Sequence, residues 1–183
     1  MKSALILIDI QNDYFPGGAM ELAGMNQAAA GAREVLEACR KARRPVFHVQ
    51  HLALGPGAAF FRPGTPGAEI HASVHPLPGE ALVRKHYPNA FRDTGLLEVL
   101  QGAGVDEVII AGAMSHMCID ATTRAAFDFG FTCTVIHDAC ATRDLAFAGR
   151  TIPAAQVHGA FMAALGMGYA RVVSLEDFLR GLS

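Results

Sequence analysis

The sequence has no apolar run long enough to form a membrane-spanning helix, so we expect no membrane partner. Its first ten residues carry one lysine and a short apolar run that ends at Asp9, which predicts no signal peptide. The 15 basic and 17 acidic residues give a formal net charge of −2, which offers no attraction for nucleic acid. The four cysteines lack the CxxC or CxxH spacing of metal sites. We therefore expect reduced thiols in a cytoplasmic protein.

Two further absences narrow the fold. No GxGxxG follows the first predicted strand, which disfavours a dinucleotide-binding domain, and we expect no cofactor. No internal repeat, linker or low-complexity tract divides the chain, so residues 1–183 are predicted to form a single domain. Hydrophobic residues make up 51% of the sequence, which is sufficient for a sizeable core.

Short apolar segments alternate with stretches of helical periodicity along the chain. The predicted strands are Ala4–Ile8, Val46–Leu52, Glu80–Arg84, Val105–Gly112, Phe131–His137 and Ala170–Val173. The predicted helices are Asn26–Arg44, Thr94–Gly102, a segment between Ser115 as N-cap and Gly130 as stop, Pro153–Leu165 and Leu175–Leu182. This alternation predicts an α/β fold with a six-stranded parallel sheet and helices on both faces, a three-layer α/β/α sandwich. The long segment Leu54–Pro78, rich in Gly and Pro, is typical of a binding loop or lid.

Cys118 is predicted to lie in the first turn of the helix that follows the fourth strand. There the helix dipole favours a thiolate, although a free cysteine is equally typical of a small buried apolar residue. Residues just past parallel strands gather at one edge of the sheet, which brings Asp9 and Lys85 to the same edge as Cys118. His51 and Asp138 follow other strands and are expected at this edge too.

An acid, an ammonium group and a thiol at one edge suit acyl transfer to cysteine. Lys85 would lower the pKa of the Cys118 thiol, and Asp9 could take the thiol proton and return it to a departing amine. Backbone N–H groups at the helix start could stabilise the oxyanion. The alternative is an ordinary ion pair between Asp9 and Lys85, which is common at a sheet edge.

Three motifs in order resemble the isochorismatase-like cysteine hydrolase superfamily over essentially the whole chain. They are ALILIDIQNDYFPGG at Ala4–Gly18, KHYPNAFRDTGLLEVL at Lys85–Leu100 and IIAGAMSHMCIDATTRAAFDFGF at Ile109–Phe131, followed by the DAC of Asp138–Cys140. The resemblance implies an Asp9, Lys85 and Cys118 triad, a cis peptide between Ala113 and Met114, and an oxyanion hole from the amides of Met114 and Cys118. It also implies a homodimer or homotetramer.

Two departures from the family pattern narrow the predicted activity. Nicotinamidases of this superfamily carry an Asp-x-His pair after the second strand, whereas this chain has His51-Leu52-Ala53, so we expect no metal. Isochorismatases proper commonly lack the cysteine that is present here. The resemblance therefore favours hydrolysis of a C–N bond in a small amide, carbamoyl or ureido compound through a thioester. An enol-ether hydrolase of the isochorismatase type and a non-catalytic reactive-thiol sensor remain the alternatives.

Residues near the triad in sequence are candidates for contact with a small-molecule substrate, because ligand sites favour aromatic walls with a few polar groups. These candidates are Gln11, Phe15, Tyr87, Asn89, His116 and Met117. Phe60 and Phe61 fit either a lid over the site or a subunit contact. Asp138 is expected to anchor a loop, and His137 and His158 are expected to be packing residues. The sequence does not identify the substrate.

Overall fold

The computed structural model describes residues 2–182 and shows a parallel six-stranded sheet, as predicted. Its strand order is β3-β2-β1-β4-β5-β8. The strands are β1 (Ser3–Ile8), β2 (Val46–His51), β3 (Ala81–Lys85), β4 (Glu107–Ala113), β5 (Thr132–Ala141) and β8 (Arg171–Val173). Among residues 2–182, no helix has the length and apolar character of a membrane span.

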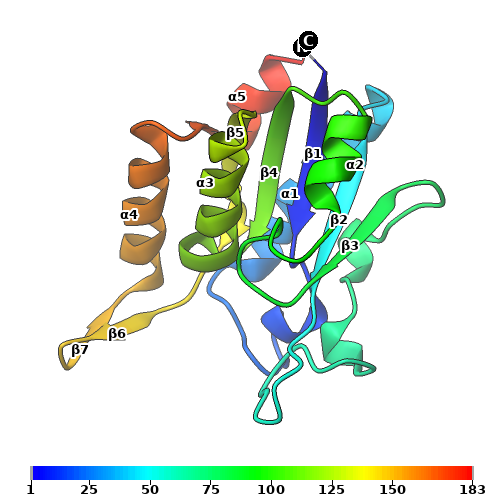
Figure 1. Cartoon of the computed structure of the whole chain (residues 1–183). Coiled ribbons are helices and arrows are strands. Elements are labelled where there is room, and N and C mark those ends of the chain that lie inside the picture. The colour runs from blue at the N-terminus through cyan, green and yellow to red at the C-terminus, as the bar shows by residue number, and fades with distance from the viewer. Residues whose placement is uncertain (1, 183) are drawn as a thin grey trace.

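Helices cover both faces of the sheet (Figure 1). One face packs against α1 (Met25–Lys41) and α5 (Leu175–Arg180), and the other packs against α2 (Leu96–Gly102), α3 (Asp120–Asp128) and α4 (Ala154–Gly166). The central strand β1 is apolar and buried on both sides, because it lies between the two helical layers. The predicted three-layer α/β/α sandwich is therefore confirmed.

Several predicted boundaries were wrong. The fifth strand continues past His137 to Ala141, so Asp138 lies within β5 rather than after it. Two short strands, β6 (Leu145–Phe147) and β7 (Arg150–Ile152), form an antiparallel hairpin that was not predicted. It projects beyond the end of α4 in Figure 1. Three residues per strand are too few to produce a recognisable alternation of apolar and polar residues.

The prediction that Ser115 caps the helix was also wrong. A π-helical turn, Ser115–Ile119, precedes α3, and the residue at its N-cap is Met114. The Ser115 hydroxyl instead lies near the Ala141 carbonyl oxygen and the Nδ1 of His158, at 3.2 and 2.8 Å. This side chain therefore ties the loop after β4 to the end of β5 and to α4.

Gly112 permits the close approach of β4 to β1 just before that loop. Its φ is +132°, and a Cβ atom there would lie 2.0 Å from the carbonyl oxygen of Ile8. Only glycine fits this geometry. The register between β4 and β5 also shifts between Ile110 and Gly112. The chain thus leaves regular strand geometry at the point where the cysteine-bearing loop begins.

Candidate active site

Four neighbouring strands deliver the polar residues of the candidate site to one edge of the sheet. Asp9 directly follows β1 and adopts a left-handed backbone conformation with φ of 53°. His51 and Lys85 are the last residues of β2 and β3 and are register partners. Cys118 lies in the π-helical turn after β4, a rare element that is frequent at functional sites. The order β3-β2-β1-β4 places these strand ends side by side.

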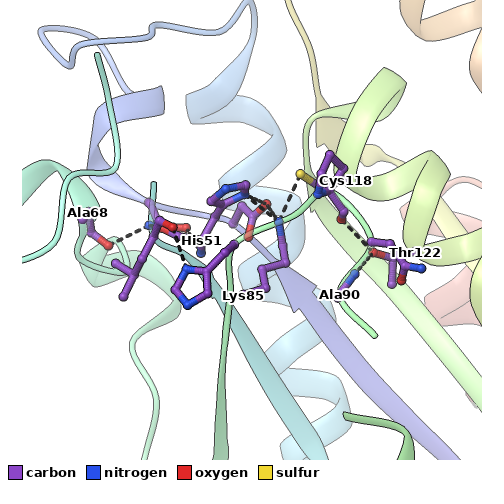
Figure 2. Close-up of polar contacts among 12 residues, drawn as sticks. His51, Ala68, Lys85, Ala90, Cys118 and Thr122 are labelled. Atoms are coloured by element: carbon purple, nitrogen blue, oxygen red, sulfur yellow. Dashed lines mark hydrogen bonds and ion pairs between the residues drawn. The ribbon is translucent and has the colours of Figure 1, made fainter. Parts of the chain in front are cut away.

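The ammonium group of Lys85 is the centre of this cluster. Its Nζ lies 2.7 Å from Oδ2 of Asp9 and 3.2 Å from Sγ of Cys118. A third contact, 2.9 Å long, joins Nζ to Nδ1 of His51. Figure 2 shows Lys85 extending between His51 and Cys118, with dashed lines to its partners. Two hydrogen-bond partners and one ion-pair partner therefore surround the ammonium group.

The cluster is almost completely shielded from solvent. Asp9 and Lys85 have no exposed surface, and Cys118 is 3% exposed. Although burial disfavours a charged amine, the neighbouring Asp9 carboxylate and Cys118 raise the pKa of Lys85. The lysine therefore stays an ammonium ion and neutralises the buried carboxylate.

The expectation that the resting cysteine favours a thiolate was wrong. Burial raises the pKa of the Cys118 thiol well above its ordinary value, and the Asp9 carboxylate raises it further. Lys85 acts in the predicted direction and lowers this pKa, but it does not outweigh the other two effects. Cys118 is therefore a thiol at rest, and a base must remove its proton before it can attack a substrate.

A carboxylate oxygen of Asp9 lies within 4.8 Å of this thiol sulfur. Both Asp9 oxygens are buried and neither has a hydrogen-bond partner within the part of the chain that the structure describes, although Oδ2 forms the ion pair with Lys85. An unsatisfied buried carboxylate oxygen is costly and is found where it serves chemistry. Oδ2 holds the lysine while Oδ1 remains available as an acceptor.

The loop from Ala113 to Cys118 connects the sheet to α3. The peptide bond between Ala113 and Met114 is cis. Amide N–H groups of the following turn fold back onto the Met114 carbonyl oxygen, with the N–H of Met117 at 3.0 Å and that of Ile119 at 3.2 Å. Both Met114 and Cys118 are buried within this loop.

A metal ion would compete with the lysine for this site. Potential ligand atoms of Asp9, His51 and Cys118 lie within 4.8 Å of one another, which is compatible with metal coordination. The Lys85 ammonium already contacts all three residues. The donor set is therefore arranged around an ammonium ion in this structure, and a divalent cation would have to displace it.

Two predicted substrate-binding residues contact parts of the protein itself. Gln11 is fully buried, and its side-chain amide donates to the carbonyl oxygens of His51 and Ala68, at 2.9 and 2.7 Å. Its Oε1 accepts from the backbone N–H of His51 at 2.8 Å. Phe15 is buried, with its ring stacked 3.7 Å from the centroid of His71. Gln11 therefore holds the end of β2 rather than facing a substrate.

The other four predicted substrate-binding residues lie at or near the surface. Tyr87 is half-buried under the Arg92 guanidinium, 3.6 Å from its ring centroid. Asn89 accepts a hydrogen bond from the Phe91 N–H. The remaining two are His116, whose Nδ1 lies against the Thr142 hydroxyl, and Met117, which is 40% exposed.

The long loop reaches the cluster through its aromatic residues. Phe61 is fully buried and packs against Tyr14, with ring centroids 4.5 Å apart. The Asp13 carboxylate accepts the Phe61 N–H at 2.6 Å and fixes this contact. Burial and the Asp9 carboxylate both raise the pKa of Tyr14. Phe61 also lies beside His51, with ring centroids 6.0 Å apart, so the long loop borders the cluster at His51.

The sequence predicts His51 at this edge of the sheet but does not reveal its contact with Lys85. Its pairing with Lys85 follows from the strand register, which the residue types alone do not reveal. Asp138, by contrast, lies away from the cluster, where its carboxylate accepts the N–H of Leu175 at 2.7 Å.

A surface cavity of about 400 Å³ lies between α1, β5 and α4. It is lined in part by Thr142 and His158, whose side chains bind His116 and Ser115 on the loop that carries Cys118. None of Asp9, Lys85 and Cys118 lines it. This cavity thus adjoins the cysteine-bearing loop and is separate from the buried cluster.

Two features define the class of this protein. The fold is a parallel α/β sandwich, and a buried aspartate, lysine and cysteine lie at the carboxyl edge of its sheet. The isochorismatase domain model matches residues 3–166, and the chain therefore belongs to the isochorismatase family of hydrolases. The resemblance inferred from its motifs is thus confirmed.

Similar proteins match over nearly the full chain. The isochorismatase family protein YddQ of Bacillus subtilis is 51% identical over 180 residues, covering 98% of this chain and all of YddQ. A streptothricin hydrolase of Streptomyces noursei is 39% identical over 89% of this chain and 59% of its own length. A crystal structure of an isochorismatase-type hydrolase from Oleispira antarctica has a TM-score of 0.95 at 51% identity, covering 98% and 97% of the chains. A maleamate amidohydrolase of Pseudomonas putida is 28% identical over 99% of this chain and 87% of its own.

Proposed function

We propose that the protein hydrolyses a C–N bond in a small amide, carbamoyl or ureido compound through a thioester on Cys118. The observation that carries this proposal is the buried contact of Lys85 with both Asp9 and Cys118, beside an Asp9 oxygen that has no partner among residues 2–182. The similarity to a protein named maleamate amidohydrolase supports an amide as the reacting group.

In the proposed first half-reaction, Asp9 takes the proton from the Cys118 thiol as the sulfur attacks the carbonyl carbon. The new C–S bond gives a tetrahedral intermediate that carries its negative charge on the carbonyl oxygen. Asp9 then returns the proton to the nitrogen, the C–N bond breaks, and an amine or ammonia leaves. A raised thiol pKa suits this scheme, since the proton leaves the sulfur only as substrate arrives.

In the second half-reaction, water attacks the thioester carbonyl carbon. Asp9 takes one proton from that water, the C–S bond breaks, and the proton passes from Asp9 to the departing sulfur. The products are the free acid, or the carbamate from a ureido substrate, and a regenerated thiol. Lys85 keeps a positive charge beside both Asp9 and Cys118, so the negative charge can move between oxygen and sulfur at low cost.

The oxyanion needs donors near Cys118. We assign this role to the backbone N–H groups of Met114 and Cys118, because both residues lie in the buried segment between β4 and α3, where the π-helical turn carries Cys118. Tyr87, Asn89, His116 and Met117 are proposed to contact the rest of the substrate, since they lie on the surface segments next to Lys85 and Cys118.

The burial of the thiol argues against the alternative of a reactive-thiol sensor. Sensor cysteines combine a low pKa with exposure, whereas Cys118 is 3% exposed and its pKa is raised. Hydrolysis of an enol ether is distinguished from the proposed reaction by its products, because an enol ether would be cleaved without release of an amine.

The test is a screen of primary amides, carbamates and N-carbamoyl compounds for release of ammonia or amine. We expect turnover by the wild-type protein, an acyl adduct on Cys118 detected by mass spectrometry after acid quenching, and loss of both in Cys118→Ala. Cys133→Ala is the matched control, since Cys133 is also buried and free but lies away from the cluster. Turnover that persists in Cys118→Ala would refute covalent catalysis by this residue.

A further inference from the structure

We infer that His51 is a positioning residue that holds the Lys85 ammonium between Asp9 and Cys118. This inference rests on the proposed function, since it assigns the third partner of the lysine on which that chemistry depends. The three acceptors of the ammonium group are Oδ2 of Asp9, Sγ of Cys118 and Nδ1 of His51, at 2.7, 3.2 and 2.9 Å.

The contact defines the tautomer of the imidazole ring. An ammonium group has no lone pair and can only donate, so Nδ1 of His51 must be unprotonated. Burial and the positive charge of Lys85 together lower the pKa of His51 to about 4, which agrees with a neutral ring. The ring proton therefore resides on Nε2, which has no partner among residues 2–182, and the side chain is 17% exposed.

His51 is itself held by its backbone. The side chain of Gln11 accepts the N–H of His51 and donates to its carbonyl oxygen, at 2.8 and 2.9 Å. The same amide also donates to Ala68 in the long loop. Because Gln11 is fully buried, these two hydrogen bonds fix the end of β2 and with it the imidazole ring of His51 that faces Lys85.

A lysine needs such a third anchor more than an arginine would. Its ammonium group is a point charge on a flexible four-carbon stem and has no planar shape to fix its orientation. Removing the His51 acceptor would leave one buried N–H without a partner, and the ammonium would move or lose charge. Either change would weaken its attraction for the sulfur of Cys118.

The experiment compares His51→Asn, His51→Gln and His51→Leu. The Oδ1 atom of asparagine can occupy the position of Nδ1, whereas the amide of glutamine extends one bond further, and leucine provides no acceptor. The measured quantity is the rate of carbamidomethylation of Cys118 by iodoacetamide between pH 7 and 10, followed on the peptide that contains Cys118. His86→Gln is the control, because His86 is exposed and next to Lys85 in sequence.

We expect His51→Asn to react within about threefold of the wild-type rate. His51→Gln and His51→Leu should react slower by about tenfold or more, the effect of one hydrogen bond to a charged group. Circular dichroism and urea midpoints establish that each variant is folded. Since asparagine and glutamine are both polar and similar in size, the Asn–Gln pair tests the inference even if the leucine variant does not fold.

Equal rates for the asparagine and glutamine variants would overturn the inference, as would wild-type rates in all three. This readout requires no turnover, so an inactive amide screen leaves it intact. A wild-type Cys118 that does not react at any pH up to 10 would also overturn the inference, since Lys85 would then give the thiol no measurable reactivity, whereas the proposed function is decided by the amide screen alone.

Discussion

Replacing Lys85 by methionine should destabilise the protein by about 3–5 kcal/mol, because it leaves a carboxylate buried without its counter-charge. Methionine has a similar length and fits the apolar stem of lysine, so little packing is lost. Asp9 is fully buried, and Lys85 is its ion-pair partner at 2.7 Å. The variant therefore isolates the cost of an unpaired charge.

The magnitude follows from the geometry. Two unit charges 2.7 Å apart attract by about 6 kcal/mol at an effective dielectric constant of about 20. Relaxation of the structure and water penetration around the uncompensated carboxylate offset part of this attraction, which leaves about 3–5 kcal/mol.

The measurement is urea unfolding followed by far-ultraviolet circular dichroism, which suits a chain without tryptophan. The double variant Asp9→Asn/Lys85→Met should recover most of the lost stability, because it removes both charges. Arg84→Met is the control: it removes a positive charge from an exposed position on the same strand and should change stability by about 0.5 kcal/mol or less. A loss below about 1 kcal/mol in Lys85→Met, or a double variant no more stable than the single one, would refute this account.

Three other variants test the surroundings of the site. Burial alone would raise the pKa of Glu80, but its hydrogen bonds to Arg40, the Leu77 N–H and His48 lower it from 4.5 to about 2. The ionised Glu80 should therefore contribute about 3 kcal/mol to the free energy of unfolding above pH 5, and this contribution should be lost as the pH falls toward 2. Glu80→Gln should abolish this pH dependence in urea titrations. Gly67→Ala would place a Cβ 2.0 Å from the Asp13 carboxylate and should speed proteolysis within residues 54–78. An unchanged cleavage rate would contradict the role of Asp13 in holding this loop. Gly112→Ala should prevent stable folding, and a thermal midpoint near that of the wild type would contradict the close approach to β1.

The fold was largely predictable because a parallel sheet buried on both faces imposes continuous apolar runs. Ala4–Ile8 and the run before Gly112 carry that signal, and the structure places both at the centre of the sheet. The β6–β7 hairpin lacked it, because its residues are exposed or half-buried. In β5 the half-buried His137 and the exposed Asp138 interrupt the apolar run, although Ala139–Ala141 are buried again.

Strand ends were a good guide to which side chains meet, and the structure brings Asp9 and Cys118 into contact with Lys85. Their catalytic roles remain a prediction. The state of the thiol was not predictable from residue types. Helix position and a nearby lysine both favour a thiolate, but burial and the nearby Asp9 carboxylate act in the opposite direction and dominate. Burial is a property of the folded chain as a whole.

Gln11 shows the same limit of the sequence. Its position two residues after Asp9 suggests substrate contact, yet Gln11 is fully buried and forms hydrogen bonds with the backbone of His51. Three side chains surround the ammonium ion of Lys85, and this arrangement is visible only in three dimensions. The buried charge of Lys85 is thus stabilised by three neighbouring side chains, and we expect the reactivity of Cys118 to depend on each of them.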